Sequence, residues 1–198
     1  GAEQVMVAVR GGILHPPGFP LQAWLARALV AISGEPHAVM ALSLLSWVAH
    51  VAAVGLLSDL GRLLGWSWPI RIIVALAWGA FAPVWALGMQ PEVFALTHLV
   101  FVAIAWVSVW ILTGAAQRSR FERWAPVVLG VAVALGAIQH SITVVAAPLF
   151  LAAAWRRLRD GDARREFVAM AVPFWLIVIF AYTSLPWLKG VDPWPGWG

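Results

Sequence analysis

The sequence has no cysteine and little charge. Of its 198 residues, 11% are charged and 62% are hydrophobic, against about 25% charged and roughly 45–50% apolar in ordinary soluble domains. Without cysteine, the chain can form no disulfide framework, thiolate metal site or cysteine nucleophile. A water-soluble protein of this length could not hide so much apolar surface. The composition therefore excludes a soluble enzyme and a disordered tail, and it indicates an integral membrane protein.

Several common motifs are missing as well. The chain has no HExxH, CxxC, Walker-type phosphate loop or GxSxG, so metalloprotease, redox, ATPase and serine hydrolase functions gain no support. It shows no repeat of 20 to 50 residues, and few charges fall near the middle of apolar runs, which disfavours a transporter or channel. The net charge is +4, but the basic residues form short clusters between apolar runs. We therefore expect no nucleic-acid partner.

Long apolar runs dominate what is present. A membrane-spanning helix needs about 20 predominantly apolar residues, and four segments meet this requirement: 38–57, 69–88, 91–112 and 167–186. The stretch 125–154 is also apolar but is interrupted by Gln139, His140 and Ser141. It is either one overlong helix or a hairpin of two short ones.

The positions of the arginines favour the hairpin. With a hairpin, the connections 58–70, 113–124 and 155–166 fall on one side of the membrane, and together with Arg71 they carry ten of the thirteen basic residues. The positive-inside rule makes that side cytoplasmic. We predict a multi-pass protein of the cell inner (cytoplasmic) membrane, with about six spans and arginine-rich loops in the cytoplasm.

The two arms of this hairpin are short. Each has about 15 residues and is about 22 Å long, whereas the hydrocarbon core is about 30 Å thick. The tip at 139–141 is therefore expected below the outer surface. Polar groups at that depth are tolerated only when protein buries them or when they face a wet cavity. We expect an external cavity there.

The amino-terminal part is predicted to lie outside. The segment 20–33 is too short and too polar to span, because it carries Gln22 and Arg27. Its apolar residues recur at helical spacing, as in a helix lying flat on the outer interface: Leu21, Trp24, Leu25, Leu29 and Ile32.

These assignments predict one all-α transmembrane domain over residues 1–198, a polytopic helical bundle. It has an external loop with the interfacial helix (1–37), membrane spans (38–186) and a second external loop (187–198). Because the chain starts without an initiator methionine or signal segment, we expect a fragment of a longer polypeptide.

Most of the unusual polar residues fall on the predicted outer side, among them Glu3, His15, Glu92 and His140. The run HPPGFP at 15–20 has two explanations: its prolines form a rigid turn, or His15 has a functional role. The run GMQPEVF predicts a turn before a helix that begins with Pro91 and Glu92. A carboxylate there is stabilised by the helix dipole, so structure and binding explain it equally well.

The order of these motifs resembles the amino-terminal half of GT-C-type membrane glycosyltransferases, and specifically the protein O-mannosyltransferase-like family. In that family, an acidic motif stands twelve residues before the motif HPPG[YF]PL. In this chain, Glu3 stands twelve residues before His15, and the run HPPGFPL is intact through Leu21. The family's aspartate, three residues before this glutamate, would precede Gly1. Gln22 stands at a position where the family often has tyrosine.

This resemblance implies a GT-C-like fold and transfer of a sugar from a polyprenyl-phosphate donor to a protein or glycan acceptor outside the membrane. Glu3 would be the catalytic carboxylate, and His15, Glu92 and His140 would bind substrate. A divalent metal near Glu3 and Glu92 stays open as a cofactor, although no metal motif is present. The alternative is a non-catalytic accessory or structural subunit that keeps the fold and packs against other membrane subunits.

Overall fold

The computed structural model describes residues 2–11 and 19–188, with side chains described as far as residue 184. Every regular element among them is helical, which confirms the predicted all-α class. The helices are α1 (Ala2–Arg10), α2 (Pro20–Ser33), α3 (Ala38–Leu63), α4 (Trp68–Ala80), α5 (Ala82–Met89), α6 (Val93–Leu112), α7 (Ala125–Gln139), α8 (Ala147–Asp160) and α9 (Ala163–Leu188). Short 3-10 turns join some of them: η1 (Glu35–His37), η2 (Glu122–Trp124) and η3 (Ser141–Ala146).

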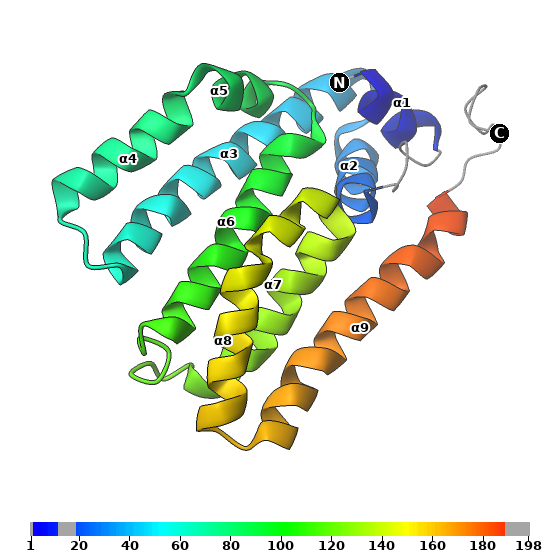
Figure 1. Cartoon of the computed structure of the whole chain (residues 1–198). Helices are drawn as coiled ribbons and strands as arrows, with labels where there is room; N and C mark the ends of the chain where they lie inside the picture. The colour runs from blue at the N-terminus through cyan, green and yellow to red at the C-terminus, as the bar shows by residue number, and fades with distance from the viewer. Residues whose placement is uncertain (1, 12–18, 189–198) are drawn as a thin grey trace.

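The long helices lie side by side in one bundle (Figure 1). Within the described residues, four helical segments are long and apolar enough to cross a membrane: Glu35–Leu63, Val93–Leu112, Ser141–Asp160 and Ala163–Ser184. The pair α4 and α5 makes a fifth if it counts as one bent span. The structure thus gives four to five candidate spans where the sequence predicts about six, because α7, with 15 residues, is only about 22 Å long.

The predicted single span over 69–88 is broken. Phe81 separates α4 from α5 with φ −58° and ψ 121°, and the two helices are bent by 65°. Pro83 explains the break: it has no N–H to bond the carbonyl oxygen of Gly79, and its ring would collide with that carbonyl in a continuous helix.

The structure confirms the interruption predicted within 125–154. Helix α7 ends at Gln139, His140 has an extended backbone with φ −166° and ψ 138°, and η3 begins at Ser141. Helices α7 and α8 then run back along each other (Figure 1). Gly130 lets α7 lie directly against α9, since a Cβ at this position would overlap the backbone carbonyl of Met170.

Helix α6 lies at the centre of the bundle, where it packs against α3, α7 and α8. In the most apolar part of α6, 61% of residues are buried inside the protein, against 11% in α9. Its hydroxyl groups bond within the helix itself: Thr97 Oγ1 donates to the Val93 carbonyl at 2.8 Å and Ser108 Oγ to the Ile104 carbonyl at 2.7 Å. Both hydroxyl groups of α6 therefore have a bond partner within their own helix.

The three arginine-rich connections lie toward the same end of the bundle (Figure 1). Arg156 donates to the carbonyl oxygen of Leu112, which ties α8 to the end of α6. Arg157 and Glu166 form a buried ion pair between α8 and α9, with Nε–Oε2 at 2.9 Å and Nη2–Oε1 at 2.8 Å. Which side of the membrane this end faces stays a prediction.

The amino-terminal segment holds two described helices, where the sequence predicts one. Helix α2 packs against α1, α3 and α7. Its buried face carries small or polar side chains: Pro20, Gln22, Ala23, Ala26 and Val30. The larger residues of the predicted apolar stripe are less buried, and Ile32 is 84% exposed. Leu21, Leu25 and Leu29 are partly buried and pack against apolar clusters of the bundle, so Ile32 is the residue of the predicted stripe that is most available to lipid. At the other terminus, the first two residues of the predicted loop 187–198 continue α9.

Candidate functional site

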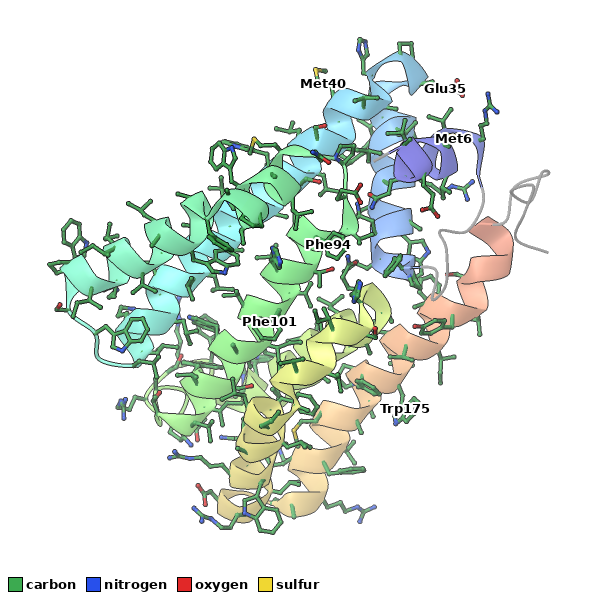
Figure 2. All side chains as sticks on the ribbon, turned by 45° about the horizontal axis from the view of Figure 1, so that its top comes forward. Met6, Glu35, Met40, Phe94, Phe101 and Trp175 are labelled. Atoms are coloured by element: carbon green, nitrogen blue, oxygen red, sulfur yellow. The ribbon has the colours of Figure 1, made fainter. Side chains whose placement is uncertain are left out.

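Four segments meet at the end of the bundle opposite the arginine-rich connections: α1, the start of α2, the start of α6 and the break after α7. Figure 2 shows Met6 of α1 and Phe94 of α6 toward this end, together with Glu35. Val7, Phe19, Ala23 and Val93 form a buried apolar cluster that joins α1, α2 and α6. Polar side chains surround this cluster and connect the same segments.

Two glutamines connect α1 and α2. Gln22 Nε2 donates to Gln4 Oε1 at 2.9 Å, and both side chains are buried. With its amide turned over, Gln4 would place a nitrogen 3.2 Å from the Pro91 carbonyl oxygen and an oxygen 2.7 Å from the Val93 N–H. In either orientation, the Gln4 amide lies against the backbone that leads into α6.

A third glutamine connects α7 to α6. Gln139 is fully buried, and its Nε2 donates to the Val93 carbonyl oxygen at 3.1 Å and to Thr97 Oγ1 at 3.3 Å. Thr97 donates to the same carbonyl, so its oxygen is free to accept the amide proton. Val93 is therefore the residue at which the two glutamine contacts meet.

Aromatic rings lie against the break in the hairpin. His140 precedes η3, and its Nδ1 accepts a hydrogen bond from the Ile142 N–H at 3.1 Å. The Phe19 ring stacks on the imidazole with centroids 5.2 Å apart, and the Phe94 ring lies 5.9 Å away. Two protein rings thus lie against His140, while Ser141 beside it is exposed. The external cavity expected here stays a prediction.

The structure brings three of the four predicted site residues to this end. Glu3 lies on α1, His140 lies at the break, and Glu92 directly precedes α6, so the helix predicted to begin at Pro91 begins at Val93 instead. The Glu92 side chain does not cap the helix by a hydrogen bond. His15 lies outside the described residues.

No group of three or more metal-ligating side chains occurs within the described ranges 2–11 and 19–188. Glu3 and Glu92 alone are too few to define a divalent-ion site there.

Gln4, Gln22 and Gln139 are the residues that sequence reasoning missed as members of a site. Gln139 was noted only as a polar interruption, Gln22 as a polar residue where the family often has tyrosine, and Gln4 had no signal of its own. Their contacts join residues 18 and 46 positions apart, and no local pattern in a single sequence encodes such pairs.

Two other histidines, His50 on α3 and His98 on α6, lie within the bundle. His50 on α3 is buried, with ring centroids 6.1 Å from Trp78 and 6.0 Å from Trp85. Its neighbours include Gly88, where an added Cβ would lie 2.8 Å from the imidazole Cγ. The rings and the glycine make His50 a packing residue that fills the angle between α4 and α5.

In comparisons with known proteins, no family model, curated protein sequence or solved structure matches this chain. Function is therefore inferred from the residues and geometry of the chain itself.

Proposed function

We propose that the chain is part of a GT-C-like membrane glycosyltransferase, similar to the protein O-mannosyltransferases. It would transfer a sugar from a polyprenyl-phosphate donor to an acceptor outside the inner (cytoplasmic) membrane, with its arginine-rich connections in the cytoplasm. One observation carries the proposal: the buried glutamine contacts hold together the segments that bear Glu3, Glu92 and His140. These segments lie at the end opposite the arginines, as an outward-facing reaction requires.

Sugar transfer needs a base and a partner for phosphate. In this proposal, Glu3 accepts the proton of the acceptor hydroxyl while that oxygen bonds to the anomeric carbon of the sugar. The bond between that carbon and the phosphate oxygen breaks, and the phosphate leaves on its lipid with the electron pair. His15 or His140, when protonated, would stabilise the leaving phosphate, and Glu92 would bind hydroxyl groups of the substrate.

The proposal is tested with the full-length protein in proteoliposomes supplied with polyprenyl-phosphate mannose and an acceptor peptide. Glu3→Gln and His15→Gln are expected to lower transfer at least about 100-fold, the lower end of what acid–base groups contribute. Glu35→Gln is the matched control, because it makes the same chemical change on exposed η1.

Two results would favour the alternative of a non-catalytic subunit. In the first, Glu3→Gln and His15→Gln transfer sugar as fast as the unaltered protein. In the second, the unaltered protein transfers no sugar but purifies with other membrane subunits.

A further inference from the structure

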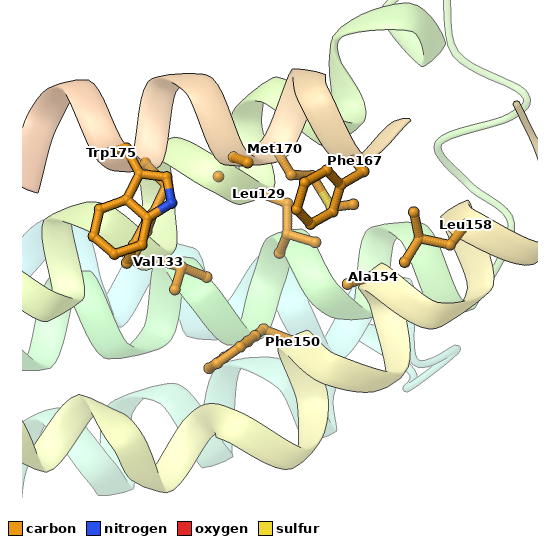
Figure 3. Close-up of a pocket in the computed structure, with 11 residues that line it drawn as sticks. Leu129, Val133, Phe150, Ala154, Leu158, Phe167, Met170 and Trp175 are labelled. Carbon is orange, nitrogen blue, oxygen red and sulfur yellow. The ribbon is translucent and has the colours of Figure 1, made fainter. Parts of the chain in front are cut away.

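An apolar groove lies between α7, α8 and α9, in the part of the bundle nearer the arginine-rich end (Figure 3). Its volume is about 390 Å³, within the roughly 300–1,000 Å³ of sites that hold small ligands. The lining side chains are apolar apart from the indole N–H of a tryptophan, and they include Leu129, Val133, Phe150, Leu158, Phe167 and Trp175. The groove therefore suits a hydrocarbon chain.

The packing of the three helices creates this groove. Helices α7 and α9 meet closely at Gly130 and Met170, whereas α8 and α9 separate with distance from their shared turn (Figure 1). Ala154 on α8 and Ala171 on α9 add little volume to the gap. The gap that remains has the shape of a wedge. It is narrow at the turn and wide toward the middle of the bundle, and another molecule can fill it.

Positive charge lies at the narrow end. Arg164 is exposed and precedes Phe167 and Ala171 by three and seven residues, so it continues the groove-lining face of α9 by one turn. Arg164 takes part in no ion pair with any residue that the structure describes. Arg164 is thus available to an anion at the narrow end of the groove.

A neighbouring cavity of about 360 Å³ is less suited to an anion. It is lined by four carboxylates, Glu122, Asp160, Asp162 and Glu166, against three arginines, Arg123, Arg157 and Arg165. Arg157 is already paired with Glu166. Of the two adjacent arginines of α9, Arg165 lines this carboxylate-rich cavity and Arg164 does not line it.

We propose that the groove binds one acyl chain of an anionic phospholipid from the leaflet at the arginine-rich end, with the lipid phosphate beside Arg164. The apolar lining accepts the chain, and a guanidinium matches the geometry of a phosphate. Basic residues at this level of a membrane attract anionic lipids. The site is remote from the candidate sugar-transfer site and does not depend on the proposed function.

Native mass spectrometry of the full-length protein tests the proposal, with phosphatidylglycerol compared against phosphatidylcholine of the same acyl chains. We expect phosphatidylglycerol to be retained about fivefold more tightly, the effect of about one basic residue at an anionic surface. Arg164→Gln should abolish this preference. Arg165→Gln, which makes the same charge change in the carboxylate-lined cavity, should leave most of it. Ala154→Phe should fill the groove and reduce retention of both lipids.

Several outcomes would overturn the assignment. Equal retention of the two lipids, or an equal loss for both arginine variants, would show attraction by net charge alone. Displacement of phosphatidylglycerol by an equal amount of polyprenyl phosphate would assign the groove to that lipid instead. A dimer that Ala154→Phe dissociates would assign it to a second copy of the chain.

A second measurement needs no variant. Phosphatidylglycerol with a photoreactive group midway along one acyl chain should crosslink to the α9 peptide that contains Met170 and Trp175. Crosslinks confined to α3 and α4 would contradict the proposed site.

Discussion

Gln139 connects two helices through one side chain. Its amide nitrogen reaches both the Val93 carbonyl and Thr97 Oγ1 from a fully buried position. Bonds of this kind contribute on average only about 0.6 kcal/mol each, because the unfolded chain also finds partners in the membrane. These bonds fix the relative position of the two helices more than they raise the free energy of unfolding.

Gln139→Leu removes both of these bonds. We expect the free energy of unfolding, measured by titration with sodium dodecyl sulfate, to fall by about 1 kcal/mol. The control is Gln90→Leu, which changes an exposed glutamine at the same end. If both variants unfold alike, the buried contacts make no measurable contribution.

The ion pair of Arg157 and Glu166 has larger consequences, because both side chains are buried. Arg157→Met alone leaves a carboxylate without its partner and should cost about 3–5 kcal/mol. The double variant Arg157→Met, Glu166→Leu should recover most of that loss, as the same titration would show. Arg159→Gln is the control, since Arg159 pairs with Asp160 on the surface. A double variant as unstable as the single one would contradict this account.

Individual residues show what one sequence can encode. The break at His140 was predictable because three polar residues interrupt an apolar run. The contact between Gln4 and Gln22 was not, since a glutamine on α1 gives no indication of which helix it will meet. The apolar groove was equally invisible, because it depends on the angle between α8 and α9.

At the scale of the helices, close contact depends on where side chains are missing. Gly130 allows α7 to meet α9, because a Cβ there would overlap the carbonyl of Met170. Gly55 on α3 faces open space, with no atom within 4 Å of an added Cβ. The two glycines therefore offer a matched comparison within one bundle.

Gly130→Ala should destabilise the protein, since the colliding atom belongs to the backbone of α9 and can yield only if the whole helix moves. Gly55→Ala should leave stability unchanged or raise it by up to about 1 kcal/mol, because alanine favours a helix over glycine. Thermal unfolding in detergent compares the two variants. Equal melting temperatures would show that α9 does not depend on this contact.

Element boundaries followed the apolar runs only in part. The sequence placed α6 and α7 well, because their ends coincide with changes in polarity. It missed the bend at Phe81, since residues on both sides are apolar, although Pro83 provided a local signal. The predicted span 38–57 also ended too early. Helix α3 continues to Leu63, because its last turns form contacts with α6. The clearest of these contacts is the bond from Trp106 Nε1 to Asp59 Oδ2 at 2.8 Å.

For the whole molecule, the shared end of the three arginine-rich connections makes a prediction about topology. The chain has no cysteine, so single cysteines can report the sidedness of each loop without a modified background. Ser119→Cys and Asp162→Cys should both be protected from a membrane-impermeant maleimide added outside intact cells. Glu35→Cys should be labelled.

This experiment also counts the crossings between residues 113 and 162. If α7 and α8 each cross, the loops that contain Ser119 and Asp162 lie on the same side. If the whole stretch from α7 to α8 crosses once, the maleimide labels one of the two and not the other. The second pattern would refute the topology with about six spans.

The self-bonded hydroxyl groups of α6 bear on how the protein is made. Helix α6 leaves the ribosome before α7, α8 and α9, yet it packs against α7 and α8 in the finished bundle. Because Thr97 and Ser108 donate to carbonyls of their own helix, no hydroxyl has to wait in lipid for a later partner. The central helix can therefore enter the bilayer with its hydroxyl groups already bonded, and Gln139 of α7 later adds bonds to the Val93 carbonyl and to Thr97 Oγ1.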